Sequence, residues 1–414
     1  DKFTKDNKKT VAYMVKEFEM KKAADQYARA SSSKTGSLDM GKLHTYKFND
    51  DLFQKVTTLP GATNHGLVLL LDWSGSMASN LQGTLNQLYN LIWFCKRTQI
   101  PFEVLAFSDV YQTEKQSKMT NFKSGDLVIK NCTMLQFFSS KMNNKDTYQM
   151  MYNLNAYASM WDYSIGKKAY RYDHCHPLRL GGTPLGECVA FALDFIPAFQ
   201  KETGVQKINT VFLTDGYGCR LDSVHHVYTD EQVYNVGYDR SLGAPLTSEI
   251  NESKKYLQYS NDIIIKDNVT NKSVNSKDFG RDTTKMLLSL LKSRVPDMNI
   301  VNFFVAGNHR GKVSKYTVSP YVSRSKEDYD YFTFNSRVSA ITKKINKEKV
   351  GIFNNVDGFD QLYLLCGLRY DTDDEVLDVE SGATKAKLKK AFGKMATQKQ
   401  LNRPLLNNFV KMVA

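Results

Sequence analysis

Short apolar runs alternate with amphipathic stretches through the middle of the chain. The run Gly66–Asp72 (GLVLLLD) is continuously apolar, which is typical of a strand buried on both faces. Leu81–Cys95 follows with apolar residues at helical spacing. Further strands are predicted at Phe102–Phe107, within Asp126–Phe138 (Leu127–Ile129 or Met134–Phe137), and at Ile208–Thr214, Ile300–Ala306 and Leu362–Cys366, and further helices at Leu185–Phe199 and Thr283–Lys292. This alternation predicts an α/β fold: a doubly wound, mainly parallel, Rossmann-like sheet flanked by helices.

Three regions differ in character. Residues 1–60 form an expected N-terminal helical lead-in, with a helix over 1–30 and a small polar break at 31–37. Residues 61–370 form the α/β domain, in which the polar segments 140–178 and 217–280 have the composition of insertions. Residues 371–414 form an acidic linker followed by a basic helical tail.

The net charge of the 414-residue chain is +13, which favours acidic partners such as nucleic acid, an anionic membrane or an acidic protein face. Eight basic residues and no acid follow Glu380, while Leu401, Leu405 and Phe409 are spaced four apart, as in an amphipathic helix that docks on protein. A hydrophobic share of 42% excludes wholesale disorder. The six cysteines form no CxxC pair, and no apolar run is long enough to span a bilayer, so a cytoplasmic location without a membrane partner is expected.

The candidate chemistry is a metal site. Asp72, Ser74 and Ser76 directly follow the first predicted strand, and ligands bind beyond the carboxyl ends of strands in open α/β sheets. Thr183 comes at the start of a predicted helix after two glycines, and Asp215 ends another buried strand. Two carboxylates and three hydroxyls suit a hard cation such as Mg²⁺, with Mn²⁺ and Ca²⁺ as alternatives.

Other residues carry weaker signals. Asp109, after the second strand, is interpreted either as a group that orients a metal-bound water or as a solvated turn. His174-Cys175-His176 and His225-His226 contain zinc-ligand types, but their spacing is not that of a zinc site. Gly307–Lys312 lacks the spacing of a phosphate-binding loop and is interpreted as a basic loop. No nucleophile–base pair accompanies the metal-site residues, so catalysis by this chain itself is not expected.

Taken together, Asp72-x-Ser74-x-Ser76, Thr183 and Asp215 resemble the metal-ion-dependent adhesion site (MIDAS) of von Willebrand factor A (VWA) domains. The chain is also similar to cobaltochelatase CobT-type subunits. That similarity is carried by Thr35-Gly36-Ser37-Leu38-Asp39, Lys42-Leu43, Phe53, His65-Gly66, Asp72–Met77, Leu180–Leu185 and Thr214-Asp215-Gly216. The compact form also resembles proteins encoded by large tailed bacteriophages.

The resemblance implies a protein-binding subunit whose metal takes an acidic side chain from its partner. It further implies a MoxR/CobS-type AAA+ ATPase as that partner, in protein remodelling or in a cobaltochelatase-like complex. In a phage-encoded protein the location would be the host cytoplasm. Two other classes remain open: a virion or adhesion-type structural binding protein, and a nucleic-acid binder that uses the basic tail.

Overall fold

The computed structural model describes part of the chain. The described residues are 11–12, 14–20, 22–23, 31–33, 56–58, 64–109, 127–128, 132–160, 178–216, 221–227, 256–259, 263–306, 312–322 and 331–366. The chain divides into two compact units. One consists of Asp1–His65, Asn90–Ile100 and Leu377–Ala414, and the other of Gly66–Tyr89 and Pro101–Val376.

A seven-stranded sheet forms the centre of the second unit. Its strands are β3 (His65–Asp72), β4 (Phe102–Ser108), β6 (Thr133–Ser139), β7 (Lys207–Thr214), β12 (Asn299–Val305), β13 (Val350–Val356) and β14 (Phe359–Leu365). Their order is β13-β14-β12-β7-β3-β4-β6. β3 pairs parallel with β4, and β12 pairs parallel with both β7 and β14. The edge strands β6 and β13 are antiparallel to their neighbours.

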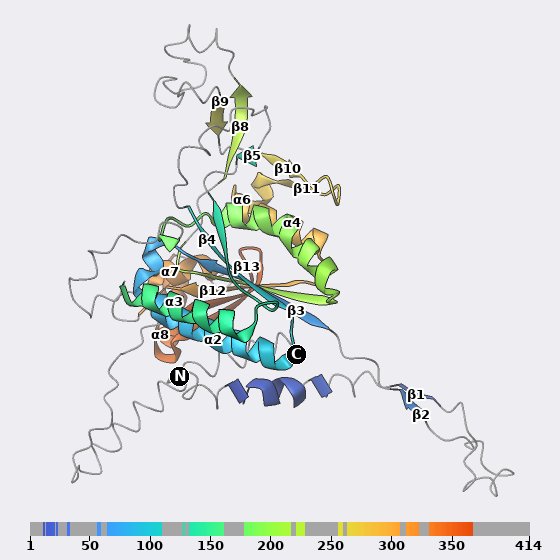
Figure 1. Cartoon of the computed structure of the whole chain (residues 1–414). Coiled ribbons are helices and arrows are strands. Elements are labelled where there is room, and N and C mark those ends of the chain that lie inside the picture. The colour runs from blue at the N-terminus through green and yellow to red at the C-terminus, as the bar shows by residue number, and fades with distance from the viewer. Residues whose placement is uncertain are drawn as a thin grey trace, which may run out of the picture. The chain divides into compact units, whose positions relative to one another are not determined.

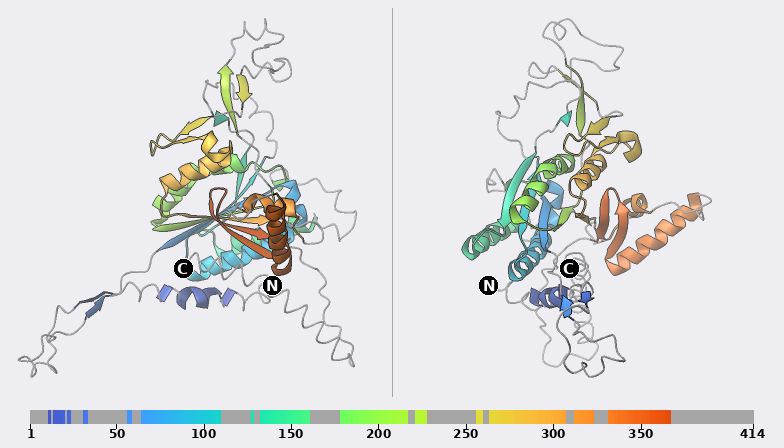
Figure 2. Two further views of the ribbon diagram at one scale, coloured as in Figure 1. Left: turned by 180° about the vertical axis from the view of Figure 1, so that it is seen from behind. Right: turned by 90° about the vertical axis from the view of Figure 1, so that its right-hand side faces the viewer.

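Helices cover both faces of this sheet. They include α2 (Leu81–Thr98), α3 (Asn144–Met160), α4 (Leu185–Thr203), α6 (Thr283–Arg294), α7 (Lys315–Val318) and α8 (Tyr331–Glu348), with the 3-10 turns η2 (Gly75–Ser79), η6 (Ser276–Phe279) and η7 (Ser319–Tyr321). α4 and α6 lie side by side on one face, and α3 lies with the start of α2 on the other (Figures 1 and 2). The predicted doubly wound, mainly parallel α/β fold is confirmed.

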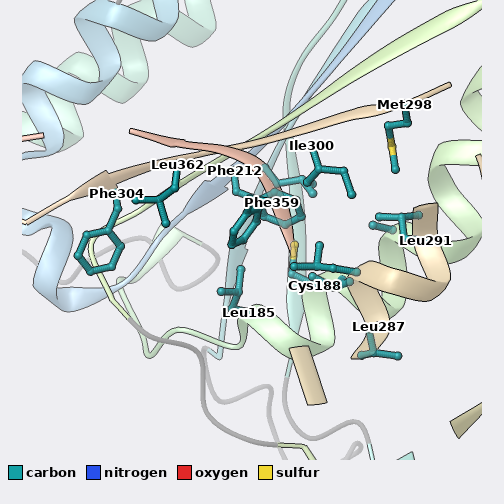
Figure 3. Packing of buried hydrophobic residues seen from close by; sticks show 14 of the residues in the cluster. Leu185, Cys188, Phe212, Leu287, Leu291, Met298, Ile300, Phe304, Phe359 and Leu362 are labelled. Atoms are coloured by element: carbon teal, nitrogen blue, oxygen red, sulfur yellow. The ribbon is translucent and has the colours of Figure 1, made fainter. Parts of the chain in front are cut away.

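A hydrophobic core lies between the sheet and the α4–α6 pair (Figure 3). Phe212, Ile300 and Phe304 point from the central strands toward this layer, where Cys188 of α4 and Leu291 of α6 meet them. Burying each large apolar side chain contributes about 1.5–3 kcal/mol. The strands are therefore held rigidly, and the loops at their ends start from fixed positions.

The predicted insertion at 140–178 differs from the structure, because its first half contains a core helix. α3 buries Met151, Leu154 and Tyr157 against the domain. Its other faces are polar, so the average composition of the segment is polar and does not indicate the short apolar stripe on the buried face. β13 and α8 were likewise not predicted. Of the two alternatives for the third strand, Met134–Phe137 lies in the main sheet, as part of β6.

The segment predicted as the second insertion forms small sheets outside the main one. β8 (Asp222–Val227) pairs with β5 (Leu127–Val128) and β9 (Tyr256–Tyr259), and β10 (Ile264–Lys266) forms a hairpin with β11 (Ser273–Asn275). Arg294 ties this hairpin to the helices. Its guanidinium donates to both carboxylate oxygens of Asp267, at 2.6 and 3.1 Å, and to Asp194 on α4 at 2.6 Å. Because Arg294 stabilises the charged form, the pKa of Asp267 falls below its usual range.

In the first unit, residues 11–12, 14–20 and 22–23 are helical, within the predicted N-terminal helix. Phe18 packs edge-on against Phe94 with ring centroids 5.5 Å apart. β1 (Ser31–Ser33), inside the predicted polar break, pairs antiparallel with β2 (Val56–Thr58). The predicted acidic linker and basic tail at 371–414 lie outside the described residues.

Candidate metal centre

The candidate site lies where the strand order reverses. From β3 the chain passes through α2 to β4 on one side of the sheet, whereas β7 lies on the other side of β3 and leads on to β12. In open α/β sheets, ligands bind in the crevice at the carboxyl ends of two such strands. Asp72 is the last residue of β3, and Asp215 directly follows β7. The Thr214 hydroxyl donates to Oδ2 of Asp72 at 2.7 Å, so the two strand ends are adjacent.

Asp72 is the most deeply placed of the predicted ligands. It is 0% exposed, and its Oδ1 is buried without a hydrogen-bond partner. Burial raises its pKa to about 6, and the nearby Asp215 carboxylate adds to the rise, while the hydrogen bond from Thr214 opposes it. A buried carboxylate oxygen without a partner is energetically unfavourable, and a bound cation would satisfy it.

Ser74, Ser76 and Asp215 form a hydrogen-bonded chain close to Asp72. Ser74 is extended, and the 3-10 turn η2 begins at the next residue, so the hydroxyls of Ser74 and Ser76 come to lie 2.9 Å apart. Ser76 donates to Oδ1 of Asp215 at 2.6 Å. Burial also raises the pKa of Asp215, an effect that this hydrogen bond opposes.

The loop that carries Thr183 runs alongside the end of β3. Gly181 accepts from the Gly75 amide at 2.8 Å and donates to the Trp73 carbonyl at 3.2 Å. A Cβ built on Gly216 would lie 3.3 Å from the Thr183 hydroxyl oxygen, so this hydroxyl borders the turn after Asp215. The structure thus brings all five predicted ligands to one place.

Asp109 has a role that neither interpretation from the sequence anticipated. Its carboxylate accepts a hydrogen bond from the Gly182 amide and so holds the backbone next to Thr183. A Cβ at position 182 would lie 2.5 Å from the Asp109 Oδ2 oxygen. Only glycine leaves room for this contact, which explains why the loop has a second glycine before its threonine.

Sequence reasoning missed Trp73, which lies between the first two ligands. It is completely buried, with its ring 4.9 Å from Phe137 and stacked at 5.7 Å on Tyr157 of α3. Its indole N–H donates to the Leu178 carbonyl at 2.8 Å. Trp73 therefore anchors both the metal-site turn and the threonine loop. A large apolar residue inside an otherwise polar turn was the available signal.

The donor set consists of two carboxylates and three hydroxyls, which suits Mg²⁺ better than zinc. Within the described residues, His, Cys, Asp and Glu form no group of three that could hold a metal ion. The segments 174–176 and 307–311 lie outside the described residues, and His225-His226 falls in β8. In the described part of the chain, no helix has the length and apolar character needed to cross a bilayer.

No family model and no curated protein matches the sequence. Among solved structures, the chain is similar to the pilus adhesin SpaC from Lactobacillus rhamnosus GG in its open conformation. The identity is 12% over 70% of this chain and 30% of SpaC, with a TM-score of 0.30. A second form of SpaC gives 13% identity, 69% and 31% coverage and the same TM-score. The chain thus spans about a third of that adhesin's length.

Proposed function

We propose that the chain is a cation-dependent protein-binding subunit built on a VWA-type domain with a MIDAS. The observation that carries this proposal is the buried, unpartnered Oδ1 of Asp72, surrounded by Ser74, Ser76, Thr183 and Asp215 at the switch point of the sheet. These five residues would hold Mg²⁺, with Mn²⁺ or Ca²⁺ as alternatives.

The bound cation would supply Lewis acidity toward an oxygen ligand of a partner protein. Mg²⁺ favours about six oxygen ligands, so these protein donors would leave room for water or for an oxygen of a partner. Gly75 and Ser76 are exposed, so the site is reached from solvent. An acidic side chain of the partner is the best-matched ligand, because a carboxylate is a hard, charged oxygen donor. Metal removal is then expected to weaken the contact.

For the partner we propose a MoxR/CobS-type AAA+ ATPase, with this chain as its adaptor in protein remodelling or in a cobaltochelatase-like complex. The support is the CobT-type resemblance of the motifs from Asp72 to Asp215. We place the complex in the cytoplasm. The described cysteines Cys95, Cys132, Cys188 and Cys366 are free thiols, the form that a reducing compartment maintains.

Two measurements test this proposal. Calorimetric titration with Mg²⁺ and Mn²⁺ should show one site in the wild type and a loss of affinity of at least about tenfold in Asp215→Ala, equivalent to about 1.4 kcal/mol. Asp297→Ala, which removes an exposed carboxylate far along the chain from the site, is the matched control. Absence of metal binding by the wild type would reject the metal centre. Co-purification in Mg²⁺ or in EDTA then tests the partner: an ATPase recovered equally in EDTA, or not at all, contradicts the adaptor role.

A further inference from the structure

Helices α7 and α8 border the same edge of the sheet as the candidate metal centre. The Val313 amide donates to Asn346 at 2.9 Å, and the Asn346 side chain donates back at 3.0 Å, so the segment leading into α7 is fixed to the end of α8. The end of α8 is in turn fixed to the end of β14, because the Cys366 amide donates to the Lys349 carbonyl at 3.1 Å. α7 lies at this edge in Figure 1.

This edge contains the carboxyl ends of the parallel strands. β12 lies next to β7 in the sheet, and β14 lies next to β12. β12 pairs parallel with both of these neighbours. Because neighbouring strands are about 4.8 Å apart, β12 and β14 end roughly 5 and 10 Å from the end of β7. An extended peptide advances about 3.3 Å per residue, so a segment of roughly five residues would reach from Asp215 to the end of α8.

The surface at this end is strongly basic. We define the basic rim as the exposed residues Lys312, Lys315, Lys343, Lys344 and Lys347. The stretches 312–322 and 331–347 contain no Asp or Glu, and the exposed Glu348 at the end of α8 is the one acid within residues 331–349. The rim therefore forms a positive field beside the cation position, which attracts a partner surface of opposite charge.

We infer that the protein-binding surface extends from the metal centre across the basic rim, and that its occupant is an acidic peptide segment of the partner. One carboxylate of that segment completes the cation's coordination, and the following carboxylates lie over the rim lysines. This inference rests on the proposed function and adds the partner's chemical class. It would also explain how a partner is selected, since a lone carboxylate at the metal provides little specificity.

The described aromatic residues favour peptide over single-stranded nucleic acid. Binding of a single strand relies on successive bases stacked on aromatic rings. Among the described residues at the rim, Tyr316 is the strongly exposed ring, at 90%. Phe332, a strongly exposed ring near the start of α8, lies eleven residues before Lys343, or roughly 16 Å along the helix.

The test uses the full chain with fluorescein-labelled decaglutamate as the probe, in Mg²⁺ and in EDTA. Binding is followed by fluorescence anisotropy. The rim variant combines Lys315→Glu, Lys343→Glu and Lys347→Glu. The matched control combines Lys145→Glu, Lys201→Glu and Lys266→Glu, which reverse three exposed lysines on α3, α4 and β10. The rim variant should bind the peptide at least about tenfold more weakly and bind Mg²⁺ no more weakly than wild type, while the control variant stays within about twofold of wild type.

The outcomes separate the two proposals. If the wild type binds no Mg²⁺, the proposed metal centre is wrong. If the wild type binds Mg²⁺ but the rim variant keeps wild-type affinity for decaglutamate, the rim inference alone is overturned. If an oligothymidylate binds the wild type more tightly than decaglutamate at the same salt concentration and loses that affinity in the rim variant, the occupant is nucleic acid and the inference is also overturned.

Discussion

Replacing Asp72 by Asn tests the reasoning about the buried carboxylate directly. Asp72 is completely buried, and burial raises its pKa from the usual 3.8 to about 6. The native state therefore binds this proton more tightly than the unfolded chain does. As the pH rises from 3.8 to about 6, the free energy of unfolding of the metal-free protein falls, and above pH 6 the whole of this destabilisation remains.

The size of this destabilisation follows from the rise in the pKa of Asp72. A rise of about two pKa units corresponds to roughly 3 kcal/mol of destabilisation of the ionised, metal-free site at neutral pH. Asparagine never ionises and retains an oxygen that accepts from the Thr214 hydroxyl. In EDTA at about pH 7.5, Asp72→Asn should therefore be more stable than wild type by up to roughly 3 kcal/mol, and the difference should disappear below about pH 4.

Guanidinium denaturation followed by circular dichroism measures this difference. The exposed Asp297→Asn is the control and should show no such change. Saturating Mg²⁺ should stabilise the wild type, by about 2.7 kcal/mol at a hundred times its Kd, and leave Asp72→Asn unaffected. A lower stability of Asp72→Asn than of wild type in EDTA at neutral pH would show that the ionised Asp72 carboxylate does not destabilise the metal-free protein.

Three further predictions concern the surroundings of the site. Gly182→Ala should weaken Mg²⁺ binding at least about tenfold in calorimetry, because its Cβ overlaps Asp109, whereas Gly75→Ala has room and should not; equal effects would contradict this. Asp109→Ala should lower Mg²⁺ affinity, Asp109→Asn should largely restore it, and the effect should vanish in a Thr183→Ala background if Asp109 acts through that loop. Arg294→Met removes the charged partner of the buried Asp267 carboxylate and should cost roughly 3 kcal/mol above about pH 4 in urea denaturation, with the cost shrinking in acid; a pH-independent loss would exclude the ion pair as its cause.

The central strands and most of their helices were predictable because buried elements have apolar residues in continuous runs or at helical spacing. β3 is buried along its whole length, and its prediction from an unbroken apolar run agrees within one residue. α6 begins at the predicted Thr283, where Asp282 caps the helix by accepting from two backbone amides. Strands at the edge of the sheet were harder to predict from the sequence. β13 has alternating exposure and polar residues such as Asn354 and Asn355, so no apolar run marked it.

The candidate site was predictable only as a set of residue types. Oxygen-bearing side chains at the ends of two buried strands indicated that Asp72 and Asp215 would share one edge of the sheet. The sequence held no indication that the Thr214 hydroxyl would donate to Asp72, or that Asp109 would accept from the Gly182 amide. These contacts join segments that are 142 and 73 residues apart in the chain, so they depend on strand order rather than on local pattern.

By itself the sequence determined the layered α/β architecture and the set of candidate oxygen ligands, because hydrophobic periodicity and strand-end motifs are local properties. Only the tertiary structure decided that β3 and β7 are neighbours, which places both carboxylates at the switch point. It also decided that Asp72 is buried deeply enough to raise its pKa, and that the lysines of α7 and α8 lie at the same edge. Such properties arise from packing between distant segments, where burial and proximity set the electrostatics.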